Sequence, residues 1–338
     1  MPPISSGRVL VTGANGYIAI WIVRSLLERG YSVRGTVRSE DKAKHLHDTF
    51  TAYWGRFETV IVEDITEAGA FDEAVKDVSA IVHTASPVYI EDEDPDKMIV
   101  PGVKGTVRVL ESALANGSSV QRIVYTSSSG SVLQLENMHR TYSEADWNDA
   151  AVETVKEKGY AASQMSKYCA SKTLAERAAW EFVEKNRNRI DWDFVALNPP
   201  FVFGPVIHEV EKPTSLNASM IWWFYNVVGG QLHPTEIGMC WIDVRDLAEA
   251  HIRAMERKEA GGERIIVAEG TWKWEDWVNA FRQTGASIHA DSEAYAASVT
   301  HQILFDTSKA ARLLELSYRS PAETTHDVLE DFRTRGWI

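Results

Sequence analysis

A tyrosine and a lysine stand four residues apart in the segment Tyr168–Lys172, which reads YCASK. The surrounding sequence has helical character, and four residues advance an α-helix by a little over one turn, so both side chains leave the same face. The phenol of a free tyrosine has a pKa of about 10, and a neighbouring ammonium group favours the phenolate and lowers that value. The pair could therefore take part in proton transfer. The simplest interpretation of these five residues alone is an amphipathic helix with a solvated lysine.

A glycine-containing loop near the start of the chain could hold a phosphate group. The stretch VTGANGYIA places Gly13 and Gly16 in a G-x-x-G spacing, with Ala19 as a third small residue. Glycine allows a tight turn and lets backbone N–H groups approach a pyrophosphate, whose charge is favoured by the start of the following helix. Many strand-to-helix turns use a glycine pair, but this one lies between an apolar run and a helical pattern. We therefore predict dinucleotide binding.

Apolar runs alternate with helical patterns through the first part of the chain. Two stretches have helical periodicity, Tyr17–Gly30 and Val103–Asn116. Short apolar runs typical of buried strands lie at Arg8–Gly13, Tyr31–Val37, Glu58–Asp64, Ala80–Ser86, Val120–Ser128 and Ile190–Asn198. Buried strands that alternate with helices indicate a parallel sheet covered on both faces. The predicted fold class is therefore α/β, a doubly wound parallel sheet of the Rossmann type.

The alternation stops after the last of these runs. Prolines punctuate the next segment, an aromatic-rich helix candidate follows, and a short strand and helix return at Cys240–Glu256. We therefore divide the chain into a dinucleotide-binding domain and a smaller, interleaved C-terminal substrate-binding part. The predicted boundaries are 1–198 with 240–258 for the first, and 199–239 with 259–338 for the second.

Composition limits the class of protein. The 338 residues carry a formal net charge of −13, which argues against binding to nucleic acid or to anionic membranes, since both need basic surface. No apolar stretch approaches the length of a membrane-spanning helix, about 18 residues, and the first residues lack a signal-peptide pattern. The two cysteines, Cys169 and Cys240, form no disulfide framework. We expect a cytoplasmic monomer or homodimer that binds a small molecule.

The histidines and two aspartates could suggest other chemistry. His45 and His47 flank a leucine on a polar helix, and no His-Glu-x-x-His or paired-cysteine spacing occurs, so we predict no metal. Asp243 and Asp246, in the segment IDVRD, could serve as an acid and a base, but they are better placed to cap the helix that starts there. His83 ends an apolar run and is expected to be a hydrogen-bonded core histidine.

Several motifs taken together resemble the short-chain dehydrogenase/reductase superfamily in its extended form. The motifs, in order, are TGANGYIA, HTAS (His83–Ser86), YTSSSG (Tyr125–Gly130), YCASK, NPPFVFGP (Asn198–Pro205) and WIDVRDLAEAH (Trp241–His251). Within the superfamily the chain resembles the dihydroflavonol-reductase-like branch, and most of all the fungal-type methylglyoxal, aldehyde and ketone reductases. The resemblance implies reduction of an aldehyde or ketone to an alcohol, with NADPH as the hydride donor and NADP⁺ as the product.

The resemblance also assigns catalytic roles. It implies that Tyr168 is the general acid, that Lys172 lowers the pKa of this tyrosine and holds the nicotinamide ribose, and that Ser128 hydrogen-bonds the carbonyl oxygen. Hydride addition leaves negative charge on that oxygen, so a hydrogen-bond donor and a proton are needed beside it. Ser127 and Ser129 flank Ser128, so the choice of serine stays open, and the sequence SSSGS also fits a flexible turn.

The residues after the second predicted strand favour NADPH over NADH. NAD enzymes of this architecture usually place Asp or Glu at the end of that strand to bond the ribose 2′-hydroxyl. Here Thr36 stands near that position, and no carboxylate occurs between Tyr31 and Ser39. The resemblance implies that Arg38 grips the 2′-phosphate, which a guanidinium can hold through two hydrogen bonds, and Lys42 is a weaker candidate. The alternative is a solvated basic loop.

The resemblance further implies which residues line the two binding sites. The expected cofactor-binding residues are Gly13, Asn15, Gly16, Tyr17, Ile18, Arg38, Lys42, Asp64, Ile65, Thr84, Ala85, Ser86, Tyr168, Lys172, Pro199 and Val202. The expected substrate-binding residues are Val88, Tyr89, Ser128, Tyr168, Pro200, Trp222 and Trp223. Adjacent helical residues point about 100° apart, so for either tryptophan packing in the core is the alternative to a place in the substrate wall.

Two other functions remain as alternatives. The first is a nucleotide-sugar epimerase or dehydratase on the same fold. Many such relatives carry an asparagine just before a V-x-G-T sequence, and here that slot is Gly102, which weakens this interpretation. The second is a non-catalytic dinucleotide-sensing protein, in which the active-site tyrosine is often lost. The presence of both Tyr168 and Lys172 argues against it.

Overall fold

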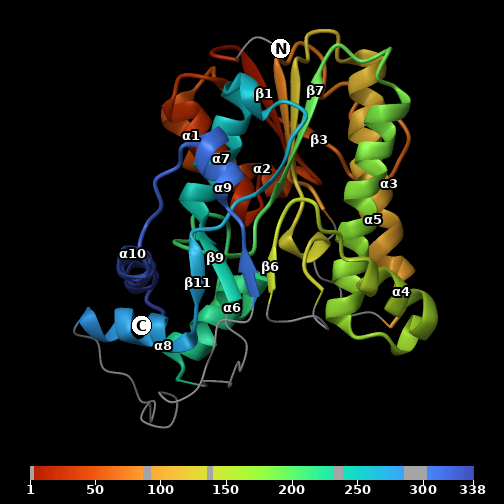
Figure 1. Cartoon of the computed structure of the whole chain (residues 1–338). Coiled ribbons are helices and arrows are strands. Elements are labelled where there is room, and N and C mark those ends of the chain that lie inside the picture. Colours follow the sequence, from red (N-terminus) through yellow and green to blue (C-terminus); the bar gives the residue numbers. More distant parts are fainter. Residues whose placement is uncertain (1–3, 87–92, 135–139, 231–238, 285–302) are drawn as a thin grey trace.

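The computed structural model describes residues 4–86, 93–134, 140–230, 239–284 and 303–338. Its centre is a seven-stranded sheet in the order β10-β7-β5-β4-β1-β2-β3 (Figure 1). Each pair of neighbouring strands in this sheet is parallel. The strands are β1 (Arg8–Thr12), β2 (Ser32–Val37), β3 (Phe57–Ile61), β4 (Ala80–His83), β5 (Arg122–Thr126), β7 (Asp193–Asn198) and β10 (Arg264–Ile266). The predicted α/β fold with a doubly wound parallel sheet is confirmed.

Helices cover both faces of this sheet (Figure 1). On one face α1 packs against α7, and on the other α3 packs against α5. Because both faces are covered, the inner strands are apolar along their whole length, which explains the unbroken hydrophobic runs in the sequence. The helices are α1 (Tyr17–Glu28), α2 (Glu40–Thr49), α3 (Asp96–Asn116), α4 (Asp149–Lys158), α5 (Gln164–Lys185) and α7 (Val244–Glu256).

Two elements reach the parallel sheet from the C-terminal half of the chain. Helix α7 lies beside α1 and contacts β5. Strand β10 pairs with β7, with Arg264 opposite Ala196 and Ile266 opposite Asn198. The central sheet is therefore completed by segments that follow the predicted domain boundary at residue 198.

The rest of the C-terminal half forms a smaller layer below the sheet (Figure 1). Its three-stranded sheet has the order β11-β9-β8, and β12 pairs with β6. The strands are β6 (Arg140–Tyr142), β8 (Phe201–Phe203), β9 (Met239–Asp243), β11 (Gly270–Trp272) and β12 (Ile303–Phe305). The helices of this layer are α6 (Ala218–Trp223), α8 (Trp274–Gln283) and α10 (Pro321–Thr334), whereas α9 (Ser308–Leu314) lies beside α7 and contacts β10.

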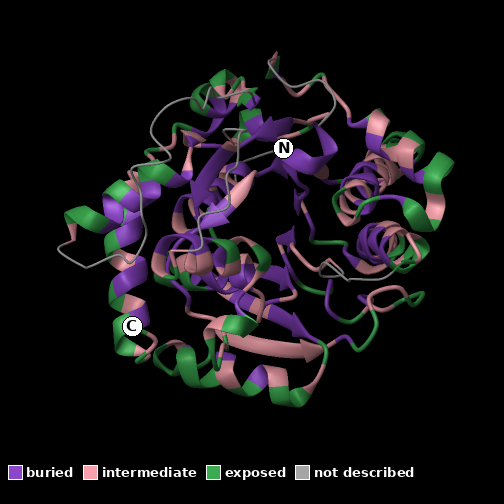
Figure 2. Cartoon of the chain, turned by 90° about the horizontal axis from the view of Figure 1, so that it is seen from below, coloured by how far each residue is buried: buried purple, intermediate pink, exposed green. Residues whose placement is uncertain are grey.

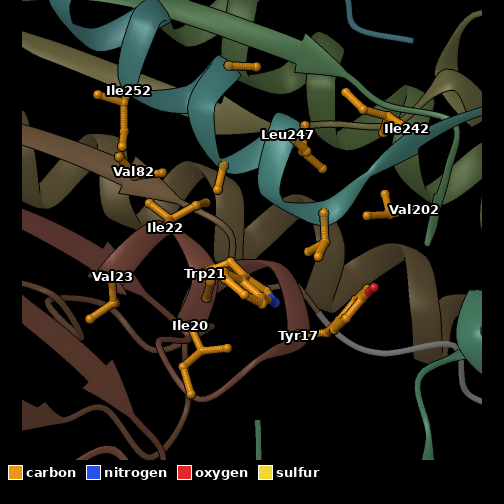
Figure 3. Packing of buried hydrophobic residues seen from close by; sticks show 14 of the residues in the cluster. Tyr17, Ile20, Trp21, Ile22, Val23, Val82, Val202, Ile242, Leu247 and Ile252 are labelled. Carbon is orange, nitrogen blue, oxygen red and sulfur yellow. The ribbon is translucent and has the colours of Figure 1, made fainter. Parts of the chain in front are cut away.

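Two hydrophobic cores lie on the two faces of the central sheet. The core under α3 and α5 includes Leu10, Ile81 and Phe194. The larger core starts between α1 and α7, where Trp21 and Leu247 pack (Figure 3), and continues into the C-terminal half. The inner strands of the central sheet are buried, the edge strand β3 is half-buried, and the outward sides of the helices are exposed (Figure 2). In the part of the chain that the structure describes, no helix is both long enough and apolar enough to cross a membrane.

Five tryptophans gather in the C-terminal half, and we call them the tryptophan cluster: Trp223, Trp241, Trp272, Trp274 and Trp277. All five are buried. The ring centroids of Trp241 and Trp277 lie 4.6 Å apart with the planes at 80°, and those of Trp272 and Trp274 lie 4.6 Å apart at 72°. These edge-to-face arrangements are the favoured geometry of aromatic pairs. The cluster joins α6, β9, β11 and α8 into one unit.

Candidate active site

The predicted catalytic tyrosine and serine meet at the carboxyl edge of the central sheet. Tyr168 lies in α5, and Ser128 lies after β5, where it caps the short helical turn Ser129–Ser131. The Tyr168 hydroxyl donates a hydrogen bond to Ser128 Oγ over 3.3 Å, and the same oxygen accepts the Gly130 N–H over 3.0 Å. The hydroxyl proton of Ser128 therefore remains available for another oxygen.

The neighbouring serines point elsewhere. The Ser127 hydroxyl donates to the Glu176 carboxylate over 2.6 Å, and the Ser131 hydroxyl lies at the same distance from that carboxylate. Ser129 is buried, and its backbone N–H donates to the Pro199 carbonyl oxygen. Of the serines in this turn, Ser128 is the one that the geometry brings to Tyr168.

Lys172 lies one turn beyond Tyr168 on α5. Its Nζ is 5.9 Å from the centroid of the Tyr168 ring and donates to Ser86 Oγ over 3.0 Å. Removal from water lowers the pKa of Lys172 to about 8. Burial raises the pKa of Tyr168 above its ordinary value, and the hydrogen bond with Ser128 opposes that rise. The role predicted for Lys172, to lower the pKa of this tyrosine, stays a prediction.

The glycine loop lies against the ends of two neighbouring strands. Gly13 has a φ of +65°, and a Cβ built on it would lie 3.2 Å from the backbone Cα of Ala85, after β4. A Cβ on Gly35, in β2, would lie only 2.7 Å from the Ala14 Cβ. The loop therefore needs glycine for its conformation and for close packing. It leads into α1 at Gly16, whose position at the start of that helix suits a pyrophosphate.

A buried hydroxyl orders the strand end that faces this loop. Thr12 Oγ1 accepts the N–H groups of Thr84 and Ala85 over 3.1 and 3.0 Å. Its own proton is thus directed to His83 Nδ1, 2.8 Å away. Burial lowers the pKa of His83 to about 3, so the ring is neutral and carries its proton on Nε2. The expectation of a hydrogen-bonded core histidine holds for Nδ1, whereas Nε2 has no partner among the described residues.

The two cations predicted to hold a 2′-phosphate differ in their surroundings. Arg38 follows β2, is exposed, and makes no ion pair with the described residues. Lys42, in α2, pairs with Glu209 over 2.9 Å. Arg38 is therefore free to meet an anion, whereas Lys42 would exchange one partner for another.

The other expected cofactor residues lie at this edge and differ in how far their side chains are buried. The Tyr17 side chain is buried and its hydroxyl donates to the Gly204 carbonyl oxygen over 2.9 Å, so only its backbone faces the loop (Figure 3). The exposed Asp64 carboxylate accepts the Thr66 N–H, which lowers its pKa. Asn15, Ile18, Ile65 and Ser86 are half-buried. Pro199 and Val202 are buried on the stretch after β7.

The expected substrate wall is described only in part. Val88 and Tyr89 lie outside the described residues. Trp222 is 43% exposed, and its ring stacks on that of Phe201 with centroids 5.7 Å apart. Trp223 has no exposed surface, because it packs against Trp277 and Phe332 inside the core. Pro200 is half-buried beside Phe201.

Sequence reasoning missed a buried ion pair behind the serine turn. The Glu176 carboxylate, on α5, has no exposed surface and pairs with Arg264 of β10 over 2.6 Å. The spacing of Tyr168, Lys172 and Glu176, each four residues from the next, could have indicated that all three share one helix face. The arginine lies 88 positions away and no local pattern indicates it.

Three further positions bear on the alternatives. A Cβ on Gly102 would lie 2.6 Å from Ser171 Oγ, so the asparagine of nucleotide-sugar enzymes would fit here only if the Ser171 hydroxyl moved. Asp243 caps α7 by accepting the Arg245 N–H over 2.8 Å, and Asp246 accepts the Arg319 N–H over 2.7 Å, so both carboxylates are structural as expected. Among the described residues, no group of three or more His, Cys, Asp or Glu is arranged to hold a metal ion.

Comparisons with known proteins agree with this arrangement. Residues 9–268 match the model of the NAD dependent epimerase/dehydratase family. An NADPH-dependent methylglyoxal reductase of Saccharomyces cerevisiae is 32% identical over 340 residues, covering 95% of this chain and 96% of its own. A ketoreductase of Aspergillus niger is 34% identical, covering 92% and 93%. The crystal structure of a yeast methylglyoxal/isovaleraldehyde reductase complexed with NADPH superposes with a TM-score of 0.85 at 30% identity, over 98% and 100% of the two chains.

Proposed function

This chain belongs to the NAD-dependent epimerase/dehydratase family, among the extended short-chain dehydrogenases/reductases and similar to their methylglyoxal and aldehyde reductases, and on that premise we propose that it reduces an aldehyde or a ketone to an alcohol with NADPH. The observation that carries the proposal is the hydrogen bond of Tyr168 to Ser128 beside the half-buried Lys172. A reaction that makes negative charge on oxygen needs these donors in one place.

The three side chains divide the work at the carbonyl oxygen. The substrate oxygen accepts hydrogen bonds from the Ser128 and Tyr168 hydroxyls, which stabilise the charge that develops on it. NADPH supplies the hydride when it is bound. Because burial keeps the pKa of Tyr168 high, this phenol carries its proton at neutral pH and can pass it to the alkoxide. The Lys172 ammonium, held by Ser86 in this structure, is placed to bind the nicotinamide ribose and to stabilise the phenolate that remains.

The cofactor site fits NADPH on features of this chain. The glycine loop packs closely against Ala85 at Gly13 and leads into α1 at Gly16, where the helix start suits a pyrophosphate. Arg38, after β2, makes no ion pair with any described residue, and the sequence from Tyr31 to Ser39 contains no carboxylate that could bond a 2′-hydroxyl. A guanidinium that binds a phosphate dianion through two hydrogen bonds favours NADPH over NADH.

The substrate wall is proposed with Trp222 as its described aromatic member. Its exposed face beyond Phe201 gives an apolar surface on which an aryl group can stack. Trp222→Ala should therefore lower turnover of aryl ketones more than turnover of methylglyoxal, by a factor of about 3–10, the size of a stacking contact. Comparing kcat/KM for the two substrates measures this ratio, and an unchanged ratio would assign Trp222 a structural role.

The decisive experiment is a substrate screen. Purified protein is mixed with NADPH and, in turn, with methylglyoxal, diketones, aryl ketones and flavanonols, and loss of NADPH absorbance is followed. We expect turnover of at least one carbonyl class and slower turnover with NADH. A folded protein that binds NADPH but reduces none of these carbonyls would contradict the proposed function and return attention to a dinucleotide-sensing role.

A further inference from the structure

The turn that carries Ser128 and the helix that carries Tyr168 are joined by one buried carboxylate. Glu176 Oε2 accepts the Ser127 hydroxyl over 2.6 Å and the Asn198 side-chain amide over 2.8 Å, and it lies 2.6 Å from the Ser131 hydroxyl. Ser127 and Ser131 stand on either side of Ser128 in the chain. The backbone at Ser128 is therefore held from both directions by a group on α5 itself.

Arg264 balances the charge of this carboxylate and extends the same network. Its Nε donates to Glu176 Oε1 over 2.6 Å, and its Nη1 donates to the carbonyl oxygens of Glu144 and Asp146 over 2.9 and 2.5 Å. Its guanidinium lies over the Trp147 ring, 3.8 Å from the centroid. Arg264 is 7% exposed and Glu176 is fully buried, so each group depends on the other for compensation.

We propose that Glu176, with Arg264 as its counter-ion, is a positioning residue that fixes Ser128 against Tyr168. It touches neither substrate nor cofactor, and it acts through the serine turn. The proposal rests on the proposed function, because it names what holds the reactive pair at 3.3 Å. Displacing a catalytic group by about 1 Å can lower turnover by on the order of 10²-fold.

Glutamine is a stringent substitution at this position. Its amide can place the NH₂ group toward Asn198, or toward Arg264 and Trp180, and each of these neighbours already presents a donor. Either orientation sets a donor against a donor, so the turn must shift although the side chain keeps its volume. Glu176→Asp keeps the charge and withdraws the carboxylate by one methylene, which gives a milder displacement.

A double-mutant cycle with Ser128 separates positioning from general stability. We expect Glu176→Gln to lower kcat by about 10²-fold and to leave the Kd for NADPH unchanged. Glu176→Asp should lower kcat by a smaller factor. In a Ser128→Ala background the same substitutions should change kcat by less than about twofold, since residues that act as a unit are not additive. Equal losses in the two backgrounds would overturn the proposal.

The ion pair between the buried Arg122 and the half-buried Asp193 provides a control. Asp193 accepts from Arg122 Nη2 over 2.7 Å at the amino ends of β7 and β5, away from the serine turn. Asp193→Asn should lower the Tm. It should change the kcat of the folded protein only slightly, and by the same factor in the wild-type and Ser128→Ala backgrounds. A Glu176 variant that behaves like this control has only a structural role.

The same cycle has a readout that needs no turnover. The ionisation of Tyr168 is followed as phenolate absorbance, with Tyr168→Phe as the blank. Ser128→Ala should raise the midpoint, because the hydrogen bond from this serine lowers the pKa of Tyr168. The Glu176 charge acts directly on Tyr168 to the same extent whether residue 128 is serine or alanine, so this direct effect cancels in the cycle. A shift of the Tyr168 midpoint that Glu176→Gln causes only when Ser128 is present supports the positioning role. An equal shift in both backgrounds contradicts that role. This result stands even if the screen finds no carbonyl substrate, so the two proposals can fail separately.

Discussion

Titratable side chains lie at both ends of the central sheet, but the surroundings of these side chains differ between the two ends. At the amino end, Arg122 is 1% exposed and its guanidinium is met by Asp193 and by carbonyl oxygens at the end of α7. At the carboxyl end, Lys172 and His83 lie in surroundings that lower their pKa values to about 8 and about 3. Charges that are fully paired contribute to stability, whereas groups held in unfavourable surroundings mark a site of chemistry. The carboxyl end also holds a fully paired ion pair, Glu176–Arg264, so the two ends differ in the side chains that only the carboxyl end keeps in unfavourable surroundings.

The largest expected effect removes a hydroxyl at the carboxyl end. Tyr168→Phe should lower kcat by roughly 10²–10⁴-fold, the range for lost acid–base catalysis, and should leave the Tm and the Kd for NADPH nearly unchanged. Steady-state kinetics and thermal unfolding measure the two quantities on the same preparation. Near-normal turnover in this variant would remove Tyr168 from its proposed role.

At the amino end the effect should fall on stability instead. Asp193→Asn leaves the Arg122 guanidinium without its counter-charge and should lower the free energy of unfolding by about 2–4 kcal/mol, somewhat below the range for a fully buried pair because Asp193 is partly exposed. Urea unfolding measures the loss, and kcat of the folded protein should stay within about twofold of the wild type. A selective loss of turnover without a loss of stability would break the comparison.

Replacing Lys172 should raise the free energy of unfolding, whereas replacing Asp193 should lower it. Its folded pKa of about 8 lies below its ordinary value, so the protonated form is disfavoured by folding. The cost to stability is fully present below about pH 8 and disappears as the pH rises toward the unfolded pKa of about 10.4. Lys172→Met should therefore raise the free energy of unfolding at pH 7 by about 2 kcal/mol, allowing for partial exposure, while lowering kcat. Urea unfolding at pH 7 and pH 10 tests this, and a gain of equal size at both values would contradict the titration.

The smallest effect concerns the cofactor alone. Arg38→Ala should raise the KM for NADPH by about tenfold, the equivalent of one hydrogen bond to a charged group, and should leave the KM for NADH nearly unchanged. Arg34, which lies in β2 and pairs with Glu58 of β3, offers a control in which neither KM should change. A wild-type enzyme that prefers NADH would refute the assignment of Arg38.

The sequence predicted those parts of the molecule that depend on local order along the chain. The parallel sheet, the turn at Gly13 and the helix that carries Tyr168 and Lys172 all follow from periodicity and spacing over a few residues. Their limits were close: the predicted helix Tyr17–Gly30 is observed as Tyr17–Glu28.

Features that join distant segments could not be predicted in this way. Strand β10 is only three residues long, and the pairing of Arg264 with Glu176 appears once the sheet is assembled. Trp222 and Trp223 are chemically identical neighbours, so the sequence cannot tell that one faces outward and the other enters the core. The raised pKa of Tyr168 likewise depends on burial by the folded chain.

The tryptophan cluster gives the C-terminal half an optical signature of its own. The indole rings of Trp241 and Trp277, and those of Trp272 and Trp274, lie 4.6 Å apart and nearly perpendicular, close enough for their excited states to couple. Indole rings held at fixed angles in a folded core give circular dichroism in the near ultraviolet, coupling between neighbouring rings changes its shape, and energy absorbed by one ring can migrate to the others. The chain therefore carries a built-in chromophore in its C-terminal half, and the spectrum of the cluster would record movement there without any added label.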